Sequence, residues 1–117
     1  MKKLYVLFII ALSGFCFAET GSVAAGSVST TFTNDAPQGI VYIHNAAVKM
    51  ATAVNDTFSI LVTKGSVDYQ IATISVTTNS VYGNVVVTNP VPIAKDGTFK
   101  ISRTKTNYAA SVYIDIR

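Results

Sequence analysis

The segment TFSILVTKGSVDYQIATISV, residues 57–76, contains two strand-like runs joined by a short glycine-containing turn. In the first run, Phe58, Ile60 and Val62 fall on one side of the chain and Ser59 falls on the other. This alternation is typical of a β-strand with one buried face. Two such runs separated by Lys-Gly-Ser indicate a β-hairpin. The segment therefore predicts a fold built from antiparallel strands.

The same alternation recurs along the chain and is clearest in YAASVYIDIR, residues 108–117. Residues 46–56 keep no helical period, and we expect a connection there. Turn signals recur roughly every 8 to 12 residues, the spacing of an all-β sandwich. The sequence predicts a single antiparallel β-sandwich, jelly-roll or immunoglobulin-like, of about seven or eight short strands within residues 28–117. The expected strands are 28–33, 39–45, 58–63, 69–76, 81–89, 98–104 and 108–117.

The first 18 residues have the composition of a secretory signal peptide. Two lysines precede a nine-residue apolar run, and small residues stand at the −3 and −1 positions of a cleavage site. The apolar run is too short to span a bilayer, which needs roughly 20 residues. We expect cleavage after Ala18, a secreted, periplasmic or extracellular location, and no membrane span in the mature chain. Residues 19–27, rich in Gly, Ser and Ala, are expected to form a flexible N-terminal arm.

Removal of this leader changes the charge and the cysteine content. Lys2 and Lys3 leave with it, so seven basic residues stand against six acidic ones and the formal net charge falls from +3 to +1. A balance so close to neutral gives no reason to expect a nucleic-acid partner. Cys16 is the only cysteine, so the exported domain is expected to have no disulfide and to depend on packing and backbone hydrogen bonds.

The residue types that catalysis and metal binding require are scarce and scattered. His44 is the only histidine, and no nucleophile motif accompanies it. The aspartates stand singly, and neither a calcium loop nor a phosphate-binding glycine loop is present. We therefore expect no catalytic residue, no cofactor, no metal site and no enzymatic activity.

Five of the seven basic residues of the mature chain lie in its last quarter. On an outward-facing hairpin they would form a surface for an anionic partner. The candidate residues of this interaction surface are Lys95, Lys100, Arg103, Lys105, Tyr108 and Tyr113. The alternative is a charged strand edge that prevents edge-to-edge aggregation.

The segment NPVPIAKDGTF, residues 89–99, reads as a corner between two strands. Pro90 and Pro92 cannot donate to a central ladder, so the segment is expected to be an edge or a crossing between sheets. Asp96 and Gly97 are expected to form the turn before the next strand, with Gly97 adopting a positive φ.

The chain from residue 55 to its end resembles small β-rich structural proteins of tailed bacteriophages, of the minor virion or decoration type. The likeness lies in a strand, an Asn-Pro-x-Pro-Ile approach, a turn and a second strand, carried by Asn89, Pro90, Pro92, Ile93, Asp96, Gly97, Phe99 and Ile101. It implies a structural assembly subunit without catalytic residues. Virion proteins usually have no signal peptide, so a secreted bacterial surface protein with a similar sandwich is the other interpretation.

Two functions fit these observations. The first is a non-enzymatic assembly subunit that packs against itself or against a larger particle or surface assembly. The second is a secreted carbohydrate-binding or adhesion module, in which exposed tyrosines stack against sugar rings. The tyrosines available for such a platform are Tyr42, Tyr69, Tyr82, Tyr108 and Tyr113.

Overall fold

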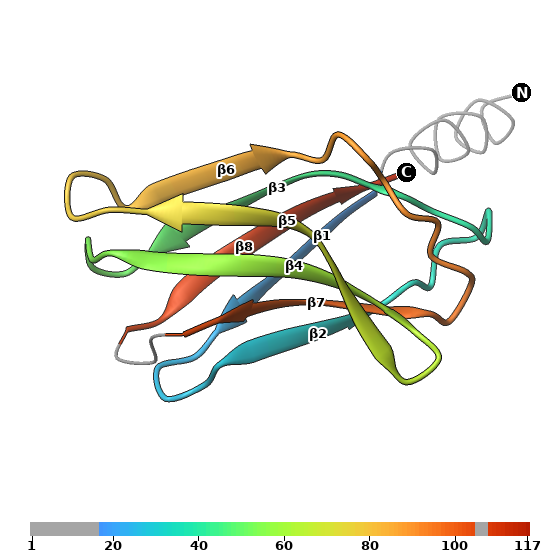
Figure 1. Cartoon of the computed structure of the whole chain (residues 1–117), viewed down its shortest axis with the longest axis horizontal. Coiled ribbons are helices and arrows are strands. Elements are labelled where there is room, and N and C mark those ends of the chain that lie inside the picture. The colour runs from blue at the N-terminus through green and yellow to red at the C-terminus, as the bar shows by residue number, and fades with distance from the viewer. Residues whose placement is uncertain (1–16, 105–107) are drawn as a thin grey trace, which may run out of the picture.

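The computed structural model describes residues 17–104 and 108–117, and within them it contains eight β-strands in two facing antiparallel sheets (Figure 1). No helix in these residues is long and apolar enough to cross a membrane. The predicted β-sandwich is confirmed. The strands are β1 (Phe17–Val23), β2 (Ser29–Thr33), β3 (Ile43–Met50), β4 (Asp56–Lys64), β5 (Val67–Val76), β6 (Tyr82–Val86), β7 (Thr98–Arg103) and β8 (Ala110–Ile116).

The strand order identifies the sandwich as a jelly roll. One sheet has the order β1-β8-β3-β6 and the other β2-β7-β4-β5. The pairs β4–β5, β3–β6, β2–β7 and β1–β8 are nested, so the chain folds as one long hairpin whose tip is the β4–β5 turn. Eight strands in two four-stranded sheets with this nesting form a jelly roll, which decides between the two predicted sandwich types.

The core lies between the sheets and follows from the alternation along each strand. In β4 the buried residues Phe58, Ile60 and Val62 point inward, as the sequence predicts. The rings of Phe32 and Phe99 stack at a centroid distance of 5.4 Å with an interplanar angle of 17°. Burying each of these large side chains contributes about 1.5–3 kcal/mol, which supplies the stability that a disulfide would otherwise provide.

Two glycines let the sheets close at their margins. A Cβ placed on Gly83 of β6 would lie 2.7 Å from Ile74 Cγ2 and 2.8 Å from Val76 Cγ1, both on β5. At the opposite margin, a Cβ on Gly21 of β1 would lie 3.0 Å from the Phe32 ring. Each glycine therefore admits a large side chain of the facing sheet.

The structure corrects the prediction of a flexible arm over residues 19–27. Residues 19–23 belong to β1, which pairs with β8 in a register that runs from Phe17 opposite Ile116 to Val23 opposite Ala110. The Gly, Ser and Ala content of this segment does not indicate a strand, because the strand depends on pairing with β8 at the other end of the chain. Residues 1–16 of the predicted signal peptide lie outside the described residues. Cleavage after Ala18 stays a prediction, and it would leave residues 19–23 paired with β8.

The structure also corrects the predicted connection over residues 46–56. Residues 46–50 continue β3, with Ala46, Val48 and Met50 buried and Ala47 and Lys49 on the outer side. Alanine on both faces weakens the hydrophobic contrast from which a strand is recognised. Within the expected strand over residues 81–89, β6 keeps a continuous register with β3 from Tyr82 to Val86.

The segment before β7 crosses from one sheet to the other, as the two prolines predict. The buried side chain of Asn34 holds this segment in place through hydrogen bonds. The Asn34 Nδ2 donates to the carbonyls of Gly39, Ile93 and Ala94 at 2.6, 3.0 and 3.1 Å. Its Oδ1 accepts a hydrogen bond of 3.0 Å from the amide of Ala36. A single fully buried side chain thus joins the β2–β3 and β6–β7 loops.

The predicted backbone geometry of the turn is wrong in one respect. Asp96, and not Gly97, has the positive φ, at 65°. Gly97 is required for a different reason, since a Cβ there would lie 2.8 Å from the carbonyl oxygen of Ala94 and 3.2 Å from Ile93 Cγ2. Aspartate is among the residues that tolerate the left-handed region, which is why the turn can place it there.

We expect Gly97→Ala to lower the free energy of unfolding by about 1–3 kcal/mol, because the added methyl group meets a backbone oxygen. Asp96→Gly is the matched control, since it removes left-handed strain in the same turn and should be neutral or stabilising by up to about 1 kcal/mol. Urea unfolding of the two variants tests the assignment. The reverse order of stability would contradict it.

Candidate functional site

The predicted basic surface is not formed as one patch in the described residues. Lys95 lies in the exposed turn before β7, whereas Lys100 lies on the outer side of β7. Tyr108 precedes β8, and Tyr113 lies on the outer face of the other sheet. Lys105 lies outside the described residues. The predicted residues that the structure describes are therefore dispersed over both sheets and both ends of the molecule.

Arg103 requires a correction, because its side chain is buried and 4% exposed. Its Nε donates to the Ser27 carbonyl at 3.2 Å, and its Nη2 donates to the Ala24 carbonyl at 3.0 Å. Its Nη1 donates to the carbonyl of Tyr108, and the guanidinium carbon lies 5.9 Å from the centroid of the Phe58 ring. Arg103 thus ties the β1–β2 turn to the residue that leads into β8, and its role is structural.

Lys100 is engaged on the outer face of the second sheet. Its Nζ lies 2.6 Å from Asp68 Oδ2, and Asp68 Oδ1 accepts a 2.7 Å hydrogen bond from Thr63. The hydrogen bond from Lys100 and then that from Thr63 hold the pKa of Asp68 below its usual range. Ionised Asp68 therefore favours the fold above pH of about 4, and this contribution is lost as the pH falls through its lowered pKa.

The two outer faces of the sandwich differ in chemistry. The outward positions of β2, β7, β4 and β5 carry mainly hydroxyl side chains, together with Leu61 and the Lys100–Asp68 pair. The other outer face, over β8, β3 and β6, gathers three of the five tyrosines in the described residues. We call it the tyrosine face and define it by Tyr42, Ala47, Tyr82, Val86 and Tyr113. Val86 is 73% exposed and Tyr82 63%, the two highest values among the large hydrophobic residues of the described chain.

Strand pairing places the members of the tyrosine face. Ala47 of β3 lies opposite Tyr113 of β8, and Lys49 lies opposite Tyr82 of β6. Tyr42 precedes β3 and exchanges two backbone hydrogen bonds with Arg117, which continues this face beyond the strand. Because residues on either side of Tyr42 are buried, its ring points outward.

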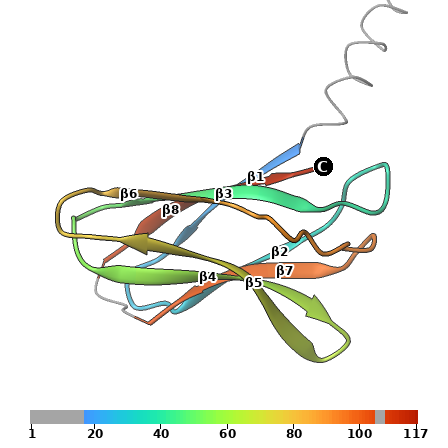
Figure 2. The same ribbon diagram turned by 45° about the horizontal axis from the view of Figure 1, so that its top comes forward.

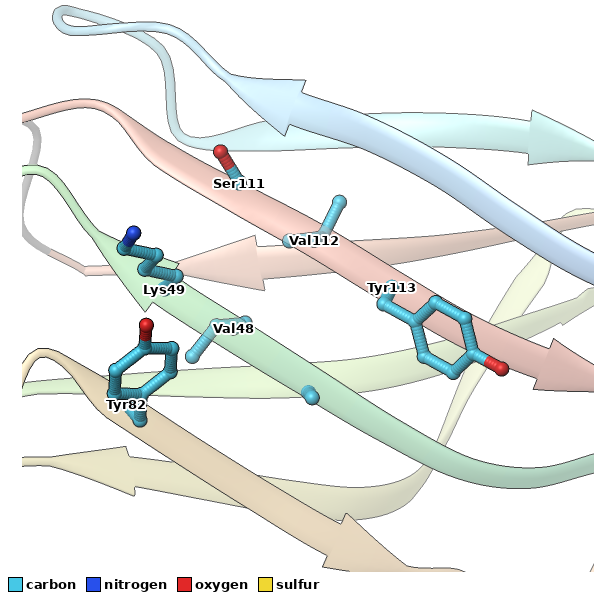
Figure 3. A pocket seen from close by; sticks show the side chains of 7 residues that line it. Val48, Lys49, Tyr82, Ser111, Val112 and Tyr113 are labelled. Carbon is cyan, nitrogen blue, oxygen red and sulfur yellow. The ribbon is translucent and has the colours of Figure 1, made fainter.

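A shallow hollow of about 220 Å³ lies at the centre of the tyrosine face (Figure 3). Ala47 and the edges of Val48 and Val112 line it, and Tyr82 and Tyr113 stand on opposite sides of β3. The small Ala47 side chain leaves this space between the two larger rings. The hollow can receive an apolar side chain or one face of a small amphiphilic ligand.

Charged groups on this face are partnered within the molecule. Lys49 Nζ lies 5.5 Å from the centroid of the Tyr82 ring. Asp115 Oδ2 accepts from Asn45 Nδ2 at 2.9 Å and from Arg117 Nη2 at 3.3 Å. The face therefore combines exposed aromatic surface with charges that already have partners.

His44 and the acidic residues are the remaining groups considered for catalysis or metal binding. His44 is the extra residue of a β-bulge, where the β3–β8 register shifts between Ile43 and Asn45. Within residues 17–104 and 108–117, no three His, Cys, Asp or Glu side chains lie close enough together to hold a metal ion.

Comparisons with known proteins concern the fold. No protein-family model and no curated protein matches the sequence. The crystal structure of the Drosophila NLP core, reported with insight into pentamer formation and histone binding, is 12% identical over 86% of this chain and 97% of its own, with a TM-score of 0.52. The capsid structure of Helicobacter pylori bacteriophage KHP30 is 6% identical over 86% of both chains, with a TM-score of 0.54. At these identities the likeness establishes a shared β-sandwich fold and nothing more.

Proposed function

We propose that this chain is a non-enzymatic assembly subunit that packs against copies of itself through the tyrosine face. One observation carries the proposal: three tyrosines and the most exposed valine gather on one outer face, while the opposite outer face is rich in hydroxyl groups. Aromatic residues are enriched at the centre of protein interfaces, and charged residues are depleted there.

The arrangement around the hollow supports a protein partner. Binding energy at interfaces concentrates in a few central residues, among which tyrosine is frequent, that fill pockets on the partner. Tyr82 and Tyr113 flank such a pocket on the same face, so each copy would offer both an anchor and a receiving hollow. A two-fold contact uses the same patch on both copies, which this combination allows.

The edges of the sheet that carries the tyrosine face favour contact through the face over strand addition. At the β6 edge, the Ser80 hydroxyl accepts a hydrogen bond from the Tyr82 amide at 3.1 Å and donates one to the Tyr82 carbonyl at 3.4 Å. At the β1 edge, the Thr30 hydroxyl donates to the Ser22 carbonyl. Both edges of this sheet thus have backbone groups occupied by a neighbouring hydroxyl, which reduces what is offered to an added strand.

The proposal also includes export of the subunit and its incorporation into a virion-type or cell-surface assembly. The predicted leader would send the subunit to the cell surface or the extracellular space. The jelly roll is shared by capsid and lectin domains, and both structural neighbours described above belong to assemblies, a pentamer and a capsid. These likenesses support a virion-type or cell-surface assembly without distinguishing between them.

The double variant Tyr82→Ser/Val86→Ser is expected to shift the purified protein toward monomer and to weaken self-association by at least about tenfold. The reason is the loss of the two most exposed apolar side chains from the contact. The matched control is Val67→Ser/Tyr69→Ser, which removes a similar valine–tyrosine pair from the β4–β5 hairpin and should leave association unchanged. Light scattering coupled to size exclusion, over a range of concentrations, measures both.

Equal loss of association in the two variants would place the contact elsewhere or make it non-specific. Unchanged association in Tyr82→Ser/Val86→Ser would exclude the tyrosine face as the interface.

A further inference from the structure

The β4–β5 hairpin extends beyond the sandwich and forms one wall of a second hollow. Figure 2 shows its tip reaching away from the two sheets. Ile71 is the extra residue of a β-bulge where the register shifts between Ile60 and Leu61, and such bulges bend a strand. The Lys64 ammonium donates to the Pro92 carbonyl and so fastens the hairpin to the β6–β7 crossing.

The space between hairpin and crossing measures about 440 Å³, within the range of small-molecule sites. Its lining combines an aromatic ring, two aliphatic side chains, two carboxamides and one ammonium group. These belong to Tyr69, Ile71, Val91, Gln70, Asn89 and Lys64. A mostly apolar wall with a few polar groups is the usual composition of a ligand site.

We propose that this hollow binds a hexopyranose unit of a glycan. A pyranose ring has one face of C–H groups, which packs on an aromatic ring, and a rim of hydroxyl groups. Tyr69 is 51% exposed and offers the ring. Carboxamides such as those of Gln70 and Asn89 each provide a donor and an acceptor, the pair that neighbouring hydroxyl groups require.

The chemistry of the lining distinguishes a sugar from other ligands. No carboxylate lines the hollow, which disfavours a metal ion or a cationic ligand. The nearest hairpin carboxylate, that of Asp68, is engaged with Lys100 and Thr63.

This site is separate from the tyrosine face and does not depend on self-association. It shares none of its lining residues with the hollow between Tyr82 and Tyr113. The bulge bends the hairpin, and the Lys64 ammonium contacts the Pro92 carbonyl of the crossing, so both walls of the hollow are formed by this chain alone.

The test is an NMR titration of the purified protein with cellobiose, maltose, lactose and chitobiose. We expect at least one of these to shift the backbone amides of residues 69–71 and 89–91 in a saturable manner. Tyr69→Ala should weaken that binding by about tenfold or more, because the stacking ring is lost. Tyr69→Phe keeps the ring and should retain binding, and Tyr82→Ala, on the other face, should bind as the parent does.

Three results would each overturn the proposal. The first is the absence of saturable shifts at residues 69–71 and 89–91 with all four sugars. The second is a set of shifts centred on Tyr82 and Tyr113. The third is full binding by a Tyr69→Ala variant whose amide spectrum shows that it is folded.

Discussion

Asn34→Ala is expected to lower the free energy of unfolding by about 4 kcal/mol, a large part of the roughly 5–15 kcal/mol of a typical domain. The Asn34 amide group makes four hydrogen bonds to backbone groups of two loops and is fully buried. Alanine would leave the Gly39 carbonyl and the Ala36 amide without a partner, whereas the Ile93 and Ala94 carbonyls would keep the backbone hydrogen bonds that they accept from Val41 and Gly97. Each buried group that loses its partner costs about 1–3 kcal/mol.

Chemical denaturation measures this loss, and two further variants control it. Asn34→Asp keeps one acceptor but loses the donors, so it should be almost as destabilising at neutral pH. Asn79→Ala removes an asparagine from an exposed turn and should change stability by less than about 0.5 kcal/mol. A loss below about 1 kcal/mol for Asn34→Ala would show that the two loops do not depend on this side chain.

Gly83→Val is expected to cost about 3 kcal/mol and to lower the melting temperature by about 10–20 °C. The valine Cβ would lie 2.7 and 2.8 Å from Ile74 and Val76 side chains and 3.1 Å from the Ser75 carbonyl oxygen. Those neighbours are core residues of β5 and a backbone atom, so they cannot move aside without opening the sandwich at this margin.

Asn84→Val is the matched control, because it introduces the same side chain one position along β6 and on the outer face. It should leave stability within about 0.5 kcal/mol of the parent. Differential scanning calorimetry compares the two, and equal melting temperatures would mean that β6 does not pack against β5 in this way.

The sequence was sufficient to predict a strand wherever one face of that strand is strongly apolar. The runs around Phe58–Val62 and Val112–Ile116 show this, because alternation there records burial directly. Residues 19–23 and 46–50 could not be assigned in this way, because Gly21 takes an inner position of β1 and alanine lies on both faces of β3, so neither run shows a strong apolar contrast. Their strands depend on partners supplied by β8, a contact that local sequence does not encode.

The site was harder to predict than the fold. Arg103 follows Phe99 and Ile101 in the same alternation, so the pattern itself indicated an inward position that its charge concealed. Tyr113 could be placed outward from its own strand. Its proximity to Tyr82 required the strand order β8-β3-β6, which follows only from the nested pairing of the whole chain.

Self-association through the tyrosine face is the central claim, and sedimentation equilibrium of the purified protein tests it most directly. The proposal predicts an average mass that rises with concentration to a defined multiple of the protomer mass. Added salt should change this little, because the charges of the face are partnered within each copy. The proposal would be contradicted by a single monomer mass at every concentration up to about 1 mM. At that concentration, even an association free energy of about −4 kcal/mol would leave half of the protein associated.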